Sequence, residues 1–457
     1  MASDKKLHAI GIGGIGVSAV ARFFRARGWE VVGTDVSTSE VTDSLEQLGI
    51  RVVAGHHPEL ITKSTNLVVY SAAVPEDDPE RIRARNLEIQ SLAYPEALSL
   101  MMEDHFGIAI SGTNGKTTTT AILGILLETA GLDPTVVVGG SVSAWKGNLR
   151  LGRGDTFVAE ACEYRRHMMK LSPQMIVLTN IEADHLDYYQ DLADIESAFT
   201  DYVKKLGEED VLVFNADDPV LRRVVRESKA RLIAYGADKQ SMVQLTATQT
   251  IGGMQYISAN VLGMPTTFET VLPGRYNAYN ILAAVSAAVA LGIKPDKVRA
   301  GVAAFQGSWR RFEQVGTFTG HPVISDYAHH PTAVRGALGA ARERYPKGKV
   351  LAVFQPHQEN RTRMLFDEFI ESFAGADTLI IEEIYEVAGR EQDGHRVSSK
   401  DLIREVRERG GVGEVLYAKD GEAVLKLVKR LAPMHNVILF MGAGDIDRAA
   451  RDLAHGV

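Results

Sequence analysis

The chain has 457 residues, which is enough for about three domains of ordinary size. Apolar residues make up 45% of it and charged residues 24%, values that are typical of a globular protein with buried cores. Lysine and arginine number 50 against 58 aspartates and glutamates. The resulting net charge of −8 argues against a protein that binds nucleic acid through a basic face.

The single cysteine, Cys162, excludes an internal disulfide and a site with several thiolate ligands. The first residues lack the apolar stretch of a signal peptide. The longest uncharged apolar run, residues 281–293, is shorter than the roughly 18 residues that a membrane helix needs. We therefore expect a cytoplasmic protein with neither a membrane nor a nucleic acid as partner.

A glycine-rich turn follows the first predicted strand. Residues 6–10 read as a short, largely apolar strand, and residues 11–16 read Gly-Ile-Gly-Gly-Ile-Gly. A helix through Arg27 and a strand at 29–33 come next, with Asp35 just beyond. This order is that of a Rossmann unit, in which glycines let backbone N–H groups approach a phosphate. The turn predicts a nucleotide or diphosphate site. Taken alone it also fits a dehydrogenase, with Asp35 on a ribose hydroxyl.

A second turn predicts an ATP site. It reads Gly112-Thr113-Asn114-Gly115-Lys116-Thr117 between a strand at 106–110 and a helix that closes on Gly131. The full P-loop pattern needs a glycine where this chain has Ile110. Even so, Lys116 is placed to reach the β- and γ-phosphates, and Thr117 to bind Mg²⁺.

Two further side chains follow predicted strands in the same unit. Glu160 comes directly after the apolar residues 157–159, and His185 follows the strand at 175–179. Neighbouring parallel strands would bring both beside the phosphate turn, where a carboxylate and an imidazole suit one or two Mg²⁺ ions. A surface glutamate and a core histidine explain the same spacing.

Strands alternate with helices along the chain, which predicts an α/β fold of parallel sheets covered on both faces. The exception is residues 245–270, whose alternation favours an antiparallel hairpin. A helix is expected at 279–291, and four strands in the last unit at 323–325, 350–354, 378–381 and 437–440. We place the domains at residues 1–103, 104–313 and 314–457.

Polar residues of the last unit also follow predicted strands. They are Asp326-Tyr327-Ala328-His329-His330-Pro331, then His357 and Arg361, while Arg310-Arg311 lies at the boundary with the central unit. An arginine there can place a guanidinium over phosphates, although an arginine pair in a linker is usually solvated. The adjacent His329 and His330 do not predict zinc, because their side chains diverge and no third ligand lies at metal spacing.

Together these motifs resemble the Mur ligase family of peptidoglycan synthesis over essentially the full length. The resemblance includes the loss of the first P-loop glycine. It rests on residues 11–16, 71–74, 112–118, 179–185, 274–277 with Asn280, 310–312, 326–331, 354–357 and 442–445. It implies a Rossmann-like N-terminal UDP-binding domain, a central P-loop ATPase-type domain and a Rossmann-like C-terminal domain on the amino-acid side. The implied reaction uses ATP and Mg²⁺ to join the lactyl carboxylate of UDP-N-acetylmuramate to L-alanine through an acyl phosphate.

The resemblance also implies roles for individual residues. The UDP-sugar would contact Gly13, Gly14, Ile15, Gly16, Asp35, His56 and Ser71. ATP would contact Gly112, Thr113, Asn114, Gly115, Lys116, Thr117, Thr118, Asn277, Asn280, Arg311 and Asp326. The metal would be held by Thr117, Glu160 and His185. The catalytic set would be Lys116, Glu160, His185, Arg311, His329 and His330, with Tyr327, His357 and Arg361 on the amino-acid side.

Two departures from the family pattern bear on specificity. The family often has Ala-Asp-Glu-Ser-Asp after the metal-binding glutamate, where residues 161–167 read Ala-Cys-Glu-Tyr-Arg-Arg-His, and Tyr276 replaces a histidine before Asn277. The acceptor could therefore be alanine, glycine, serine or, as in the murein-recycling ligase, a tripeptide. A Rossmann dehydrogenase and a non-catalytic binding module are the alternatives of other classes. A monomer and a homodimer are equally compatible with the sequence.

Overall fold

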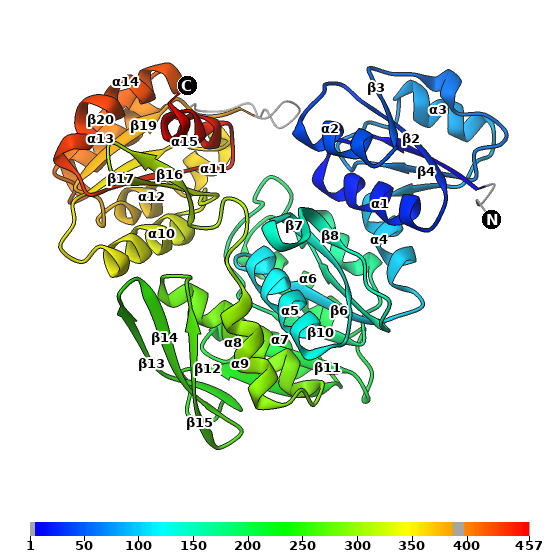
Figure 1. The fold of residues 1–457 in the computed structure, drawn as a ribbon, viewed down its shortest axis with the longest axis horizontal. Helices are drawn as coiled ribbons and strands as arrows, with labels where there is room; N and C mark the ends of the chain where they lie inside the picture. Colours follow the sequence, from blue (N-terminus) through cyan, green and yellow to red (C-terminus); the bar gives the residue numbers. More distant parts are fainter. Residues whose placement is uncertain (1–4, 387–396, 457) are drawn as a thin grey trace.

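The computed structural model describes residues 5–386 and 397–456. Its strands form three sheets, one in each of the three units of Figure 1, which are blue, cyan to green, and yellow to red. The predicted α/β fold in three units is confirmed. We propose the domain boundaries at 103/104 and 313/314. The first falls between two sheets, and the second lies one residue into Glu313–Phe318, the edge strand with which the C-terminal sheet begins.

The N-terminal sheet has the strand order β3-β2-β1-β4-β5 and is parallel throughout. The order changes direction between β1 and β4, which opens a crevice at the carboxyl ends of the strands. The helices of this unit are α1 (Ile15–Ala26), α2 (Glu40–Gln47), α3 (Pro79–Asn86) and α4 (Tyr94–Met102). The strands are β1 (Lys6–Ile10), β2 (Glu30–Asp35), β3 (Arg51–Ala54), β4 (Leu67–Tyr70) and β5 (Ser91–Ala93).

The central sheet has the order β15-β14-β13-β12-β11-β10-β6-β9-β7-β8. Its strands are β6 (Phe106–Ser111), β7 (Thr135–Val142), β8 (Gly147–Arg150), β9 (Thr156–Glu160), β10 (Met175–Leu178), β11 (Val211–Asn215), β12 (Arg231–Gly236), β13 (Val243–Ile251), β14 (Met254–Val261) and β15 (Met264–Thr270). Its helices are α5 (Lys116–Ala130), α6 (Leu192–Val203), α7 (Pro219–Val224), α8 (Arg275–Ala290) and α9 (Pro295–Ala304), with the 3₁₀ segment η3 (Tyr164–Lys170).

The strand order of this sheet places the predicted site. Strand β6 lies between β9 and β10, with Ile110 beside Glu160 and Ser111 beside Leu178. The ends of all three strands therefore meet where the phosphate turn begins.

Two predictions for the central unit are corrected. Residues 243–270 form a three-stranded antiparallel extension of the sheet rather than a single hairpin, because a second tight turn at Leu262-Gly263 returns the chain. Helix α8 begins at Arg275, one turn before the expected start, because Gly274 with φ of +94° turns the chain into the helix.

The C-terminal sheet has the order β16-β17-β21-β18-β19-β20. It is parallel except for the edge strand β16, which pairs antiparallel with β17 and was not expected. The strands are β16 (Glu313–Phe318), β17 (His321–Asp326), β18 (Val350–Phe354), β19 (Thr378–Glu382), β20 (Glu414–Ala418) and β21 (Val437–Met441). The helices are α10 (Pro331–Arg344), α11 (Glu359–Met364), α12 (Phe366–Ser372), α13 (Ser399–Arg409), α14 (Gly421–Leu431) and α15 (Ile446–His455).

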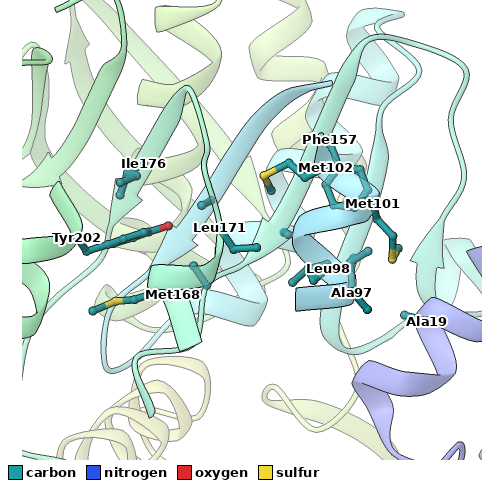
Figure 2. Close-up of a cluster of buried hydrophobic side chains, with 14 of the residues drawn as sticks. Ala19, Ala97, Leu98, Met101, Met102, Phe157, Met168, Leu171, Ile176 and Tyr202 are labelled. Carbon is teal, nitrogen blue, oxygen red and sulfur yellow. The ribbon is translucent and has the colours of Figure 1, made fainter. Parts of the chain in front are cut away.

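One apolar core runs through the N-terminal and central units. Figure 2 shows side chains of α4 between Ala19 of α1 and side chains of the central unit. Phe23 of α1 packs edge-to-face on Phe157 of β9, with 6.5 Å between ring centroids. Met102 at the end of α4 lies over Gly107 of β6, where a Cβ would come within 2.5 Å of its sulfur. Helix α4 is therefore shared by two units.

The core clusters of the C-terminal unit contain only residues from 312 onward. This unit meets the central one through polar contacts of Arg361 with Asp184 and of His330 with the carbonyl of Ala183, and Arg311, in the segment that leads into it, donates to Thr117. Apolar packing thus fixes the first two units to one another, and hydrogen bonds and ion pairs place the third.

Gly16 tests the packing of α1 against α4, the helix shared by the first two units. A Cβ at Gly16 would lie 2.7 Å from the ring of Tyr94, so Gly16→Ala is expected to destabilise the protein by about 1–3 kcal/mol through overpacking. Gly339 in α10 has open space around its Cβ position, so Gly339→Ala is expected to be neutral or to stabilise by up to about 1 kcal/mol. Urea unfolding followed by circular dichroism measures both. Equal effects of the two changes would contradict this packing.

Candidate active site

The crevice of the N-terminal sheet holds a cavity of about 480 Å³. Five predicted residues line it: Gly13, Gly14, Asp35, His56 and Ser71. The backbone N–H of Gly13 donates to the Asp35 carboxylate at 2.8 Å, so this acid closes the glycine turn from the second strand.

The predicted Ile15 and Gly16 lie outside this cavity. The carbonyl of Ile15 accepts a hydrogen bond from the side chain of Asn148 in the central unit, and Gly16 packs against Tyr94. Both residues belong to the first turn of α1, which turns away from the cavity toward the neighbouring unit. Close packing of α1 on Tyr94 of α4 explains this glycine, whereas the sequence pattern attributed it to a ligand.

Sequence reasoning missed the acidic floor of the cavity. The Glu80 carboxylate is buried and accepts from Thr34 at 2.6 Å and from the backbone of His57 at 3.0 Å. Asp78 caps the start of α3 and lies 3.0 Å from His56. His56, Asp78 and Glu80 each offer one atom that could bind a metal, and these three atoms lie within 4.8 Å of one another. Among the described residues this is the one group of three or more histidine, cysteine, aspartate or glutamate side chains so close together. Their oxygens already accept backbone and hydroxyl hydrogens, which accounts for the cluster without a metal.

The phosphate turn has the backbone that its glycines allow. Gly112 and Gly115 have φ of +132° and +88°, a region that other residues rarely adopt. The amide of Asn280 on α8 fills the space beside Gly115, where a Cβ would come within 2.3 Å of its oxygen. Asn114 is held by Asn180, whose side chain accepts its N–H at 2.9 Å. The turn is thus fixed from two sides, with the N-terminus of α5 open to an anion.

Lys116 folds back over this turn. Its ammonium donates to the carbonyls of Gly112 at 2.5 Å and Thr113 at 3.1 Å, and it pairs with Glu163 at 2.8 Å. Burial would lower the pKa of Lys116, but the neighbouring acidic groups, Glu163 foremost, together raise it. Lys116 is therefore a firmly held cation at the start of α5.

Glu160 contacts the first turn of α5 through Thr117. Its carboxylate accepts from Thr117 at 3.2 Å and from the backbone of Gly139 at 2.5 Å. Burial raises the pKa of Glu160, against the lowering effect of the Gly139 N–H and of Arg311. Arg311 donates to the same Thr117 hydroxyl at 3.1 Å.

The residues predicted to hold Mg²⁺ fit that ion. A hydroxyl, a carboxylate and an imidazole are available from Thr117, Glu160 and His185, and His185 Nδ1 is buried without a hydrogen-bond partner among the described residues. Mg²⁺ commonly takes one or two carboxylates and completes its shell with phosphate and water oxygens, so a tighter protein cluster is not required.

A second cavity of about 570 Å³ opens beside the phosphate turn. Of the predicted ATP residues, Asn114, Gly115 and Asn280 line it, whereas Asn277 is buried and donates to the carbonyl of Pro273 at 2.7 Å. Tyr276, which the sequence singled out beside Asn277, also lines it, and the residues missed from the sequence include Asn215, Asp217, Arg275 and Tyr279. Asn215 is the last residue of β11, and a polar residue at the carboxyl end of a predicted strand is the feature of the sequence that could have identified it as a site residue.

Asp326 is turned to the linker rather than to this cavity. Its carboxylate accepts from the backbone of Phe312 at 2.7 Å and of Ala328 at 2.8 Å, and burial raises its pKa. Arg310 and Phe312 have φ of +54° and +49°, a strained conformation that brackets Arg311. Asp326 thus holds the linker in the shape that directs Arg311 to Thr117.

The two adjacent histidines differ in their contacts. His330 donates from Nε2 to the carbonyl of Ala183 at 3.0 Å, and its Nδ1 faces the N–H of Thr332 at 3.4 Å, so both nitrogens are engaged. His329 donates from Nδ1 to the carbonyl of Tyr327 at 2.8 Å, which leaves Nε2 unprotonated. Burial lowers the pKa of His329 well below its ordinary value. His329 is therefore a neutral imidazole.

The remaining predicted residues gather beside His329. His357 lies 6.0 Å from it between ring centroids and 3.4 Å from Arg361, and Arg361 pairs with Asp184 at 2.9 Å across the unit boundary. Arg361 lowers the pKa of Asp184 strongly, against the effect of burial.

The stretch that departs from the family pattern forms the wall around His185. The Tyr164 ring lies 4.8 Å from the His185 ring, and its hydroxyl donates to Asp187 at 3.1 Å. Arg166 pairs with two acids of α6. Burial raises the pKa of Cys162 to about 12, so this thiol stays protonated at neutral pH.

Three known domain families match the chain nearly end to end. The Mur ligase family catalytic domain matches residues 6–106, the Mur ligase middle domain residues 110–288, and the Mur ligase glutamate ligase domain residues 310–444. The chain belongs to the Mur ligase family. The resemblance inferred from the motifs is thereby confirmed, and membership favours a ligase over the dehydrogenase alternative.

Individual members of the family are similar over the whole length. The UDP-N-acetylmuramate–L-alanine ligase of Clostridium acetobutylicum is 38% identical, over 97% of this chain and 96% of that protein. The protein of the same name from Salinibacter ruber is also 38% identical, over 98% and 94%.

Among solved structures, the UDP-N-acetylmuramate–alanine ligase of Thermotoga maritima superposes with a TM-score of 0.81 at 28% identity, over 99% of this chain and 98% of that one. A murein peptide ligase from Psychrobacter arcticus (22% identity, TM-score 0.73) and the ADP complex of a Mur ligase from Thermotoga maritima, MurF (17%, 0.64), share the fold. The first covers 98% of both chains; the second covers 93% of this chain and 95% of that one.

Within the part of the chain that the structure describes, no helix has the length and apolar character needed to cross a bilayer.

The Asp184–Arg361 pair yields a stability prediction. Arg361→Ala leaves a buried carboxylate without its partner, which is expected to cost about 3–5 kcal/mol, and the double variant with Asp184→Asn should recover part of the loss. Because the pKa of Asp184 is lowered, the contribution of the pair is full above about pH 4 and fades as the pH falls further. Urea unfolding at several pH values measures this. If the losses in free energy of unfolding of the two single variants add up to that of the double variant, the pairing is contradicted.

Proposed function

We propose that this Mur ligase uses ATP to form an amide between the lactyl carboxylate of UDP-N-acetylmuramate and the amine of L-alanine, for peptidoglycan precursor synthesis in the cytoplasm. The observation that carries the proposal is the 36–38% identity to curated proteins of that activity over nearly the whole chain. Two separate cavities, one at each of two nucleotide-type glycine turns, support a reaction with two nucleotide substrates.

In the first step the lactyl carboxylate attacks the γ-phosphorus of ATP, the bond to the β-γ bridging oxygen breaks, and ADP leaves an acyl phosphate. The turn at 112–115 and the N-terminus of α5 bind the phosphates, and Lys116 and Arg311 place positive charge beside them. Mg²⁺ held by Thr117, Glu160 and His185 would supply further neutralisation of phosphate charge.

In the second step the neutral amine of alanine attacks the acyl carbon, and phosphate leaves. The amine loses a proton, and His329 Nε2 is placed to accept it, since its Nδ1 is committed to Tyr327. Arg361 and His357 lie on the same side, and the Arg361 guanidinium offers positive charge to the carboxylate of the amino acid. Contacts of His330 and Arg361 with residues 183–184 close the site and exclude water from the acyl phosphate.

Phosphate release from ATP tests the proposal, with UDP-N-acetylmuramate present and each amino acid or the murein tripeptide as acceptor. Turnover with L-alanine and the mass of UDP-N-acetylmuramoyl-alanine are expected. Turnover with the tripeptide alone would assign the recycling reaction instead, and no turnover with any acceptor would reject muramate as substrate.

Lys116→Ala is expected to reduce phosphate release to background, because the phosphates lose their buried cation. Binding of UDP-N-acetylmuramate, measured by calorimetry, should remain nearly unchanged, since its cavity is formed by the N-terminal sheet. Equal loss of both would show that the two nucleotide sites are not separate.

His329→Gln is expected to lower kcat for amide formation by about 10²–10⁴-fold through loss of the base, with ADP binding retained. His321→Gln is the matched control, because His321 begins β17 at the end of that strand opposite Asp326. Quenched-flow measurement of amide product compares the two variants. Undiminished turnover of His329→Gln would remove this residue from the proton transfer.

A further inference from the structure

Glu163 is a buried carboxylate in the nucleotide site to which the motifs assign no role. Its side chain lies 2.8 Å from the Lys116 ammonium and 3.3 Å from Nε2 of His185, and the residue is 2% exposed. Its own carbonyl accepts from the Tyr189 hydroxyl at 2.5 Å. Glu163 is therefore fixed through both its backbone and its side chain, between a phosphate-binding group and a metal-binding one.

The contact with His185 decides which nitrogen carries the proton. An ionised carboxylate only accepts hydrogen bonds, so the Nε2 that faces Glu163 holds the hydrogen. The other nitrogen, Nδ1, is buried and has no hydrogen-bond partner among the described residues. Its lone pair is thus free, which is the form in which an imidazole binds a metal.

The imidazole is also restrained in position. His185 has φ of +55°, a conformation uncommon for a residue with a side chain, and its carbonyl accepts from the N–H groups of Tyr188 and Tyr189. The ring of Tyr164 covers it at 4.8 Å. With the tyrosine on its face and the carboxylate at Nε2, the ring presents Nδ1 in one direction.

We propose that Glu163 is a positioning residue: it holds His185 with Nδ1 free for the Mg²⁺ that accompanies ATP, and it balances the charge of Lys116 until the phosphates arrive. The proposal rests on the use of ATP with Mg²⁺ proposed above. Carboxylate partners of this kind fix the ring orientation of metal-binding histidines and make the imidazole a stronger ligand. If Glu163 served only to balance the charge of Lys116, removing its carboxylate would leave His185 unchanged as a metal ligand.

Mn²⁺ binding to the full chain with saturating ADP tests the proposal, since Mn²⁺ replaces Mg²⁺ and is read by electron paramagnetic resonance. Glu163→Ala is expected to weaken Mn²⁺ binding by about 10–100-fold and to diminish the imidazole ¹⁴N coupling in the pulsed spectrum. Glu163→Gln keeps an oxygen that accepts the Nε2 hydrogen, so it should retain the coupling. His185→Ala identifies the coupling by its loss.

Glu196→Gln is the matched control, because Glu196 also pairs with a cation in the central unit, but on α6 with Arg223 at the surface. It should bind Mn²⁺ like the unchanged protein. Wild-type affinity and ¹⁴N coupling in Glu163→Ala would overturn the proposal, as would a spectrum of the unchanged protein without imidazole coupling.

A second measurement needs no folded variant at position 163. The ¹⁵N resonances of histidine in the metal-free protein, with His185 assigned from its loss in His185→Ala, should show Nε2 protonated and Nδ1 bare. The opposite tautomer would overturn the proposal. Neither measurement uses UDP-N-acetylmuramate or alanine, so inactivity on those substrates would reject the proposed function without affecting this result.

Discussion

A buried positive charge organises the end of the central sheet. The ammonium of Lys116 lies under the phosphate turn with two carbonyls and the Glu163 carboxylate around it. An uncompensated ion at this depth would be strongly disfavoured, so the chain must bring a carboxylate to it from the loop after β9. The same carboxylate then faces His185 from the loop after β10. Because β6 lies between these two strands, one charge pair links all three loops of the site.

Different kinds of interaction hold the three units together at their two boundaries. A continuous apolar core joins the first two units through α4, and its cohesion does not depend on ligands or on charge. The third unit is attached by Arg361 and His330 and by Arg311 in the segment that leads into it, and each of these contacts a residue of the nucleotide site or beside it. Polar contacts of this kind can be exchanged for water or substrate at small cost, so the state of the site and the placement of the third unit are coupled.

Much of the fold could be predicted from local signals. The glycine turns at 11–16 and 112–115 stand between clear strand and helix patterns, and the Rossmann-like order followed from them. The antiparallel β13–β15 extension and the edge strand β16 were harder, because period-two alternation marks a strand without specifying its partner.

Of the candidate site, the phosphate turn and the histidines after β17 lie together as the motifs suggested, whereas Gly16, Asn277 and Asp326 serve packing or backbone contacts. The roles of Gly16 and Asp326 depend on Tyr94 and Phe312, which lie outside the local motif of each residue. Glu163 escaped notice for the same reason. Its stretch was interpreted only as a departure from a pattern, and its partners lie 47 positions before it and 22 after it.

The shared helix α4 sets where this chain can be divided. Leu98, Met101 and Met102 are buried against both the first and the central unit, and each such side chain gains roughly 1.5–3 kcal/mol from burial. A fragment that ended after α4 would expose the apolar side chains of that helix to water. A fragment that began after α4 would lack those side chains and expose the core around Phe157. The C-terminal unit has its own closed cores. A cut between the second and third units would therefore expose less apolar surface than a cut between the first two.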